Sequence, residues 1–477
     1  MVAIQVYNTL TRKKEVFEAK NERVNIYVCG VTPYDETHLG HARPSVIWDV
    51  IKKYLRWQGY QVYHVQNFTD IDDKIIARAL NEGKTAQEIS SYYIQDYLES
   101  MAALGVEEAD VYPKVSEHIP EIIGLIEVLI AKGHAYAVNG NVFFDVLSFP
   151  EYGKLSNQKL DQLQAGTRFE VDPDKRNPMD FALWKAAKPG EPAWDSPWGK
   201  GRPGWHIECS AMSQKYLGCE FEFHGGGADL VFPHHENEIA QSEAATSKPL
   251  AKYWLHNGML NLKNAKMSKS EGNFVTVKQV LAKYPKELVR FYILSNHYRS
   301  ELEFHDSKLD EVARGWQRFN DCVQKVASVI KEQQDPVEEL AALDAQLLEA
   351  VEETKQQFIA AMNDDFNTAL AIANLFELQS KVNSYLANFE PSPMSNCVLQ
   401  QVYKLFKQLA GDILGVLKLD STNVEGLTEP LMDLILRLRT ELRKEKNYQL
   451  ADMIRDSLEE LNILVEDTPQ GPRWKFK

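Results

Sequence analysis

The chain has 477 residues, of which 44% are hydrophobic and 25% are charged, an ordinary composition for globular proteins. A chain of this length is too long to fold around a single hydrophobic core, so several domains are expected. The formal net charge of −15 argues against broad electrostatic binding of nucleic acid, so any RNA contact must come from local basic patches.

The amino-terminal segment has no features of a targeting signal. Arg12, Lys13 and Glu15 interrupt it, and it lacks an apolar core. A run of about 18 apolar residues, the length of a transmembrane helix, occurs nowhere in the sequence. We therefore expect a cytoplasmic protein without a membrane partner.

A β-α-β unit is predicted in the first seventy residues. Asn25 to Val28 is a short apolar run, the segment from His41 carries apolar residues at helical spacing, and Gln61 to Phe68 alternates as a second strand. Such a unit opens a doubly wound parallel sheet, in which ligands bind beyond the carboxyl ends of the strands. Cys29 and Thr69 fall at these ends and are candidate site residues.

The rest of the chain predicts an interrupted α/β domain followed by helices. An Asn139-Gly140 hairpin signal and a stretch rich in Pro, Gly and Trp are typical of an insertion. Strand patterns resume at Glu220 to His224 and Tyr253 to Leu260, and long amphipathic helices follow. We predict a Rossmann-like doubly wound α/β fold with six regions: 1–110, first half of the catalytic domain; 111–204, connective insertion; 205–262, second half; 263–307, a loop region; 308–419, a helical bundle; and 420–477, a small α+β tail domain.

The sequence HLGH, residues 38–41, leads from the first strand into the first helix. Free backbone N–H groups and the helix dipole favour phosphate there, and Gly40 lets a nucleotide approach the backbone. His38 and His41, three residues apart, can both face the phosphates. Taken alone, the pattern is better explained by two solvent-facing histidines at a helix start.

The sequence KMSKS, residues 266–270, lies in a polar loop with Gly272 just after it. Lys266 and Lys269 are suited to cover the charge that develops on a triphosphate as pyrophosphate leaves. A cluster of Lys and Ser is otherwise an ordinary solvated loop.

Five cysteines, an odd number spread thinly along the chain, do not form a disulfide framework and leave thiols free for metal. A mixed donor set that suits zinc is available from Cys29, Cys209, His234 and Glu238. His234 and Glu238 are one helical turn apart and can share an ion, whereas His235 and Glu236 are expected to face elsewhere. The alternative is that Cys209 is a buried small hydrophobe and His234 and Glu238 form a surface pair.

Together, HLGH and KMSKS resemble the two nucleotide signatures of class I aminoacyl-tRNA synthetases, HIGH and KMSKS. The segments Gly204 to Ser210 and Gly225 to Glu238 resemble signature segments of the cysteinyl-tRNA synthetase family. Residues 365–370, DFNTAL, resemble the family's bundle motif, whereas Glu271 stands where many relatives carry an apolar residue. The resemblance implies a ligase that converts cysteine and ATP with Mg²⁺ to cysteinyl-adenylate, then transfers cysteine to the 3′-terminal adenosine of tRNA(Cys).

The resemblance also assigns roles to individual residues. It implies one Zn²⁺ per chain, which recognises the substrate thiolate and is held by Cys29, Cys209, His234 and Glu238. The cysteine pocket is implied to contain Thr69, Trp205 and His206, with Asp229 a further candidate for gripping the ammonium or the ribose. ATP binding and catalysis fall to His38, Gly40, His41, Lys266 and Lys269.

Contact with tRNA is expected from the loop region, the bundle and the tail, with the anticodon at the tail. Candidate RNA-binding residues in the tail are Arg437, Arg439, Arg443 and Trp474. Trp474 is suited either to stack an anticodon base or to cap the small domain. We expect a monomer.

Three other functions remain open at this stage. A ligase that joins cysteine to an amino sugar would share the zinc site and both nucleotide motifs, but relatives of that kind lack the tail. A zinc hydrolase would use Glu238 as a base. A non-catalytic tRNA-binding protein is the third, and the intact HLGH and KMSKS segments count against it.

Overall fold

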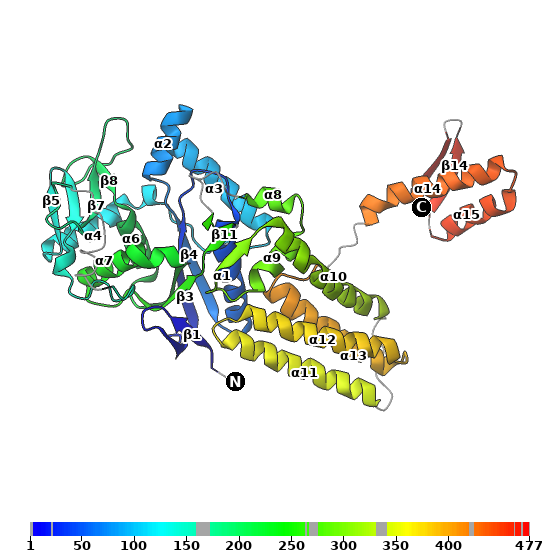
Figure 1. The fold of residues 1–477 in the computed structure, drawn as a ribbon. Coiled ribbons are helices and arrows are strands. Elements are labelled where there is room, and N and C mark those ends of the chain that lie inside the picture. Colours follow the sequence, from blue (N-terminus) through cyan, green and yellow to red (C-terminus); the bar gives the residue numbers. More distant parts are fainter. Residues whose placement is uncertain are drawn as a thin grey trace. The chain divides into compact units, whose positions relative to one another are not determined.

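The computed structural model describes most of the chain (Figure 1). The described ranges are 3–20, 22–158, 172–262, 265–266, 275–330, 341–418, 424–461, 463–468 and 471–476. The chain divides into two compact units, Met1–Leu417 and Lys418–Lys477. Within the described ranges, no helix combines the length and the apolar composition needed to cross a membrane.

A four-stranded parallel sheet forms the centre of the first unit. Its strands lie in the order β10-β9-β3-β4. Their bounds are Ala251–Asn257 for β10, Phe221–Gly227 for β9, Arg23–Val31 for β3 and Gln61–Phe68 for β4. The helix α1, Leu39–Trp57, connects β3 to β4, so the predicted β-α-β unit and parallel α/β fold are confirmed.

The two faces of this sheet are covered by different helices. Alternate side chains of a strand point to opposite faces, and Ile26 and Val28 join the core that contains α1. Tyr27, between them, joins a second core with α6 (Trp205–Leu217) and α7 (Glu236–Thr246). Both faces of β3 are therefore buried, and a ligand can reach its residues only at the strand's end.

An antiparallel sheet in the order β5-β6-β7-β8 lies in the region predicted as an insertion. Its strands are β5 (Ala135–Val138), β6 (Asn141–Phe144), β7 (Phe181–Ala186) and β8 (Gly201–Pro203), and α4 spans Ile119–Ala131. Asn139 and Gly140 have φ of 50° and 80°, the two positive values that a tight hairpin turn requires. The hairpin predicted from this dipeptide is confirmed.

Smaller elements complete the catalytic part of this unit. The paired strands β1 and β2 span Gln5–Asn8 and Lys13–Val16, and the helices α2 and α3 span Asp73–Glu82 and Ala86–Ala103. A second small sheet has the order β12-β11-β13, formed by Ala265–Lys266, Leu260–Leu262 and Leu302–Phe304. The short helices α8 and α9 span Val277–Leu281 and Lys286–Leu294.

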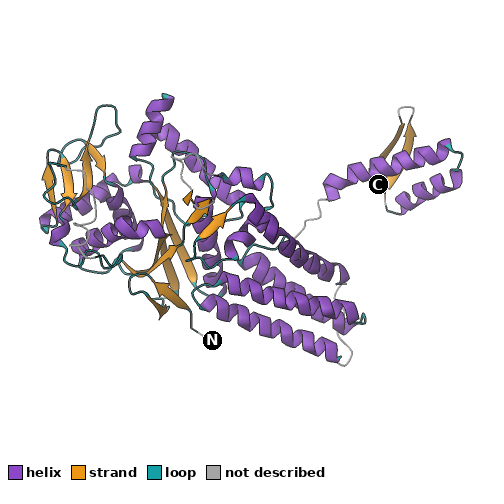
Figure 2. Cartoon of the chain, viewed as in Figure 1, coloured by secondary structure: helices purple, strands orange, loops and turns teal. Residues whose placement is uncertain are grey.

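Four long helices form a bundle at the end of the first unit (Figures 1 and 2). They are α10 (Asp306–Val329), α11 (Ala342–Asn363), α12 (Thr368–Asn388) and α13 (Pro393–Phe406). Between α11 and α12, Asp365 is fully buried and accepts hydrogen bonds from Tyr7 N and Tyr298 Oη, each at 2.8 Å. This turn thereby connects the bundle to the amino-terminal strand.

The second unit has its own small core. Its helices are α14 (Val424–Lys444) and α15 (Tyr448–Glu460), and its hairpin consists of β14 (Ile463–Thr468) and β15 (Gly471–Phe476). Met432, Leu436 and Leu458 are buried between them. The unit thus combines two helices with a terminal hairpin around one small core.

A buried ion pair joins α1 to α9. Arg290 Nη2 lies 2.6 Å from Asp49 Oδ2, and both side chains are almost completely shielded from solvent. The same guanidinium donates to the carbonyl oxygens of Leu414 and Gly105. The helix that carries HLGH is therefore fixed to the bundle side of the unit by one charged group.

We predict that Asp49→Ala lowers the free energy of unfolding by about 3 kcal/mol, because it leaves Arg290 buried without its carboxylate. Lys14→Ala, which breaks a half-exposed pair with Asp364, is the control and should cost less than about 1 kcal/mol. Urea denaturation followed by circular dichroism measures both values. Equal losses in the two variants would show that the buried pair does not stabilise the unit.

Candidate active site

The four predicted metal ligands meet at the carboxyl edge of the central sheet. Cys29 lies near the end of β3, Cys209 on α6, His234 in the turn just before α7, and Glu238 in the first turn of α7. The two Sγ atoms are 3.8 Å apart, Cys29 Sγ is 3.4 Å from Glu238 Oε1, and His234 Nε2 is 3.1 Å from the same oxygen. All four donor atoms lie within 4.8 Å of one another. We call these four residues the donor cluster.

A bulge in β3 positions Cys29. The register between β3 and β4 shifts between Val28 and Val31, and bulges redirect side chains next to functional sites. Gly30 is required here because a Cβ on it would lie 1.5 Å from the carbonyl oxygen of Asn67 on β4. The close approach of the two backbones directs Cys29 toward the cluster.

The expectation that His235 faces elsewhere is wrong. Its Nε2 lies 3.2 Å from Cys29 Sγ, and Cys29, His224, His235 and Glu238 form a second set of donors within 4.8 Å of one another. The prediction overlooked that His235 stands three residues before Glu238, a spacing that also shares a helix face, and its Nε2 lies 3.9 Å from Glu238 Oε1. Glu236 does face elsewhere, since it accepts hydrogen bonds from Leu155 N and Ser156 N.

His224 is a site residue that sequence reasoning missed. It is fully buried on β9, and its Nε2 lies 2.8 Å from Glu238 Oε2. A histidine at the end of a short strand pattern, just before three glycines, was the signal available in the sequence.

Charges within the donor cluster stabilise one another. Burial opposes ionisation of Glu238, but His224 and His234 outweigh it and hold the pKa of this carboxyl well below its usual range. Burial likewise opposes protonation of His234, yet Glu238 and Cys209 raise its pKa to about 10. The hydrogen bond from Cys29 lowers the pKa of Cys209 to about 6, whereas burial and Cys209 raise the pKa of Cys29. The cluster thus holds anionic donors in the protein interior, and a divalent cation bound there would balance their charge.

Two of the residues predicted for the cysteine pocket, Trp205 and His206, lie beside His234 of this cluster. The ring of Trp205 lies 4.3 Å from that of His234 and remains 41% exposed. His206 Nδ1 is 2.9 Å from His234 Nδ1, and burial together with that imidazole holds the pKa of His206 well below its usual range. Thr69 is buried directly after β4. Asp229 is exposed on the turn that follows β9.

The HLGH segment forms the start of α1. His38 is the N-cap residue, and its ring stacks on that of His41 with a centroid separation of 3.7 Å. Gly40 lies in the first turn, at the positive end of the helix dipole.

The same segment pairs through its backbone with the residues just beyond KMSKS. Leu39 N donates to Val275 O at 3.1 Å, and Val277 N donates to Thr37 O at 2.9 Å. Lys266 is the last residue of β12, while its side chain and all of Lys269 lie outside the described residues. The structure therefore brings the two motifs together at their flanks.

Arg439, predicted as an RNA contact, is not available for one. Its side chain is 2% exposed and donates to both carboxylate oxygens of Asp467, at 2.7 and 3.0 Å. Arg443 contacts the same carboxylate but stays 45% exposed, and Arg437 is exposed. Trp474 is half-buried and packs against the small core of the second unit.

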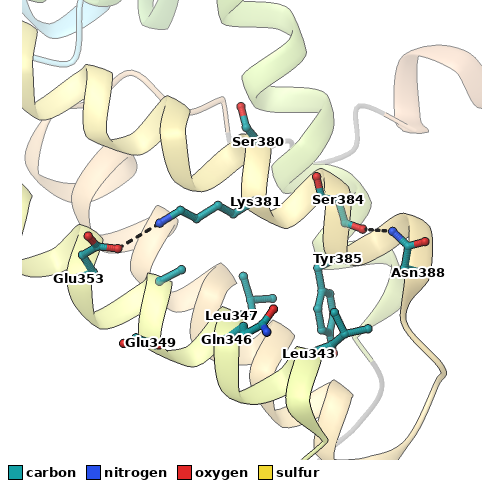
Figure 3. A pocket seen from close by; sticks show the side chains of 11 residues that line it. Leu343, Gln346, Leu347, Glu349, Glu353, Ser380, Lys381, Ser384, Tyr385 and Asn388 are labelled. Carbon is teal, nitrogen blue, oxygen red and sulfur yellow. Dashed lines mark hydrogen bonds and ion pairs between the residues drawn. The ribbon is translucent and has the colours of Figure 1, made fainter.

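A groove elsewhere in the first unit holds none of the predicted site residues. It runs between α11 and α12 (Figure 3) and is lined by Leu347 and Tyr385, with the Lys381–Glu353 ion pair across it. Its position in the bundle separates it from the edge of the central sheet.

Comparison with known families identifies the catalytic region and part of the bundle. The family described as tRNA synthetases class I (C) catalytic domain matches residues 15–314, and the DALR domain matches residues 357–418. Among solved structures, the fold is similar to that of Mycobacterium tuberculosis methionyl-tRNA synthetase in complex with methionyl-adenylate. That match has a TM-score of 0.63 and 16% identity, and covers 82% of this chain and 93% of the other. The Thermus thermophilus arginyl-tRNA synthetase gives a TM-score of 0.56 with 13% identity, covering 86% and 84%.

Curated relatives match over almost the full length. The cysteine–tRNA ligase of Pelotomaculum thermopropionicum is 51% identical over 487 residues, covering 99% of each chain. That of Heliobacterium modesticaldum is 50% identical, covering 99% of this chain and all of the relative. The chain therefore belongs to the cysteine–tRNA ligase family of class I tRNA synthetases.

Proposed function

We propose that this protein activates cysteine with ATP and transfers it to tRNA(Cys). The observation that carries the proposal is that a buried, thiol-rich donor cluster and the HLGH helix lie at one edge of the sheet. They do so in a chain that is about half identical to cysteine–tRNA ligases along its whole length. Because that match includes the tail, it disfavours an amino-sugar ligase, and it equally disfavours a zinc hydrolase.

Zinc fits the donor cluster. Two thiols, an imidazole and a carboxylate are a donor set that zinc prefers, and their donor atoms are close enough to share one ion. Cys29, Cys209, His234 and Glu238 would hold it, one per chain. A zinc ion held there would supply a site that prefers a thiolate to a hydroxyl, and so cysteine to serine, whose hydroxyl is a harder and less acidic ligand.

The side chains around the cluster orient it. His224 contacts Glu238 Oε2, which leaves Oε1 directed at Cys29 and His234. Nδ1 of His235 forms a hydrogen bond with Nε2 of His256 at 2.7 Å, so the His235 ring is also held on the side opposite Cys29. Partners of this kind fix ligand geometry before substrate arrives.

The first chemical step is attack of the cysteine carboxylate on the α-phosphorus of ATP with Mg²⁺, with pyrophosphate leaving. His38, His41 and the backbone at Gly40 hold phosphates, while Lys266 and Lys269 balance the charge that develops on pyrophosphate. In the second step, a hydroxyl of the terminal adenosine of tRNA attacks the carbonyl carbon, and AMP leaves. Catalysis is thus mainly positioning and charge stabilisation.

The pocket residues hold the amino acid during both steps. Trp205 and His206 would pack against the side chain of cysteine, and Thr69 and Asp229 offer oxygens to its ammonium group or to the ribose. The loop region 263–307, the bundle and the tail would hold the tRNA, with Arg437, Arg443 and Trp474 as candidate contacts in the tail. A cytoplasmic monomer remains our prediction.

Replacing a cluster thiol should remove metal and activity together. We predict that Cys209→Ser loses bound zinc and reduces cysteine-dependent pyrophosphate exchange by more than about 100-fold, since even indirect partners of a metal ligand are worth about 10–100-fold. Elemental analysis and exchange kinetics measure the two effects. Cys322→Ser, a buried thiol on α10, is the matched control and should keep both. Full exchange without zinc in Cys209→Ser would refute the metal's role.

The KMSKS lysines should act on the first step alone. We predict that Lys269→Ala slows pyrophosphate exchange by about 100-fold or more, the usual effect of removing a group that stabilises transition-state charge, while affinity for tRNA stays nearly unchanged. Lys283→Ala, an exposed lysine paired with Asp306, is the control. An unaltered exchange rate in Lys269→Ala would remove this residue from the mechanism.

The tail should serve tRNA rather than activation. Removal of residues 418–477, which form a separate unit, is expected to leave pyrophosphate exchange within about threefold and to reduce tRNA charging by about 100-fold or more, because basic contacts to phosphates are lost. Both rates are measured on the same preparation. Equal losses would contradict a tail that acts on tRNA.

A further inference from the structure

One carboxyl group at the site has no role in the mechanism above. Glu208 lies beside Cys209 on α6, is 1% exposed, and its Oε2 lies 3.1 Å from Thr69 Oγ1. Burying such a group costs several kcal/mol unless it is hydrogen-bonded. Its partner is a hydroxyl that we assign to the cysteine pocket.

Asn67 connects this hydroxyl to the donor cluster. Its Oδ1 accepts from Gly30 N at 2.9 Å, which fixes the orientation of the amide, and its Nδ2 then donates to Thr69 Oγ1 at 3.3 Å. The same Oδ1 lies 3.6 Å from Cys209 Sγ. Thr69 is therefore held one side chain away from a metal-binding thiol.

The hydrogen bonds of the Thr69 hydroxyl leave one of its two lone pairs able to accept a further bond. A hydroxyl has one proton and two lone pairs. The proton goes to Glu208 and one lone pair receives Asn67 Nδ2, so only one acceptor position remains. A cysteine whose sulfur is bound at the cluster carries its ammonium two carbon atoms away, and an ammonium can only donate.

We propose that Glu208 is a positioning residue that makes Thr69 an obligate acceptor and thereby gives the pocket its preference for the substrate's ammonium group. Without Glu208, the hydroxyl can rotate and present its proton to the ammonium. This proposal rests on the proposed function, because it requires cysteine to bind with its sulfur at the donor cluster.

A pair of thiols isolates the contribution of the ammonium group. Cysteamine carries a thiol and an ammonium, whereas 1-propanethiol has a methyl group in place of the ammonium. Each is measured as an inhibitor of cysteine-dependent pyrophosphate exchange by the full-length protein. The ratio of their inhibition constants reports the preference for the ammonium and is unaffected by a general loss of activity.

We expect Glu208→Met and Thr69→Val each to reduce this ratio by about tenfold, the usual effect of losing a hydrogen bond to a charged group. Glu208→Gln keeps an oxygen acceptor and should restore the ratio to within about threefold of the wild-type value. Glu222→Met is the matched control: it also loses a buried carboxyl group, but one that accepts from Lys20 N and Asn25 N near the start of β9, and its ratio should be unchanged.

An unchanged ratio in Glu208→Met would overturn the proposal. Should that variant not fold, an unchanged ratio in the isosteric Thr69→Val overturns it equally, and a tenfold loss there supports it. Failure of the proposed function is distinct, because the wild-type protein would then show no cysteine-dependent exchange at all.

Discussion

The carboxylate of Glu238 is fully shielded from solvent, and the arrangement of the site depends on how its charge is balanced. Burying an unpaired carboxylate costs several kcal/mol, so the fold must supply partners on every side. His224 comes from β9, His234 from the turn before α7 and Cys29 from β3. The contacts with His224 and Cys29 therefore also tie α7 to the sheet, so the geometry of the site and the packing of its supporting helix depend on the same residues.

The parallel sheet makes this convergence possible. Strands β3, β4 and β9 are distant in sequence, yet their carboxyl ends meet at one edge, where ligands bind in folds of this type. The thiol proposed to bind zinc, the hydroxyl proposed for the cysteine pocket and a helix start suited to phosphate thus lie at the same edge of the sheet. Cysteine and ATP can meet there without large rearrangement of the scaffold, which is how a mechanism based on positioning obtains its rate.

The sequence predicted those parts of the fold and site that depend on local patterns. The β-α-β unit follows from periodicity within seventy residues, and the Asn139-Gly140 turn from the chemistry of two. His235 was misjudged because only the four-residue spacing of His234 and Glu238 was considered, although residues three apart share a helix face as well. Arg439 was misjudged because its partner, Asp467, lies in a hairpin that no charge count along the helix reveals.

The backbone pairing between HLGH and the residues after KMSKS affects how changes in either motif should be interpreted. Leu39 and Val277 hold the two segments together through main-chain N–H groups, which every amino acid except proline possesses. Side-chain replacements in the motifs therefore leave this junction chemically intact. Altered kinetics in such variants therefore report the loss of a functional group rather than the displacement of a segment. The same backbone pairing would keep the two segments in place when their side chains change during evolution.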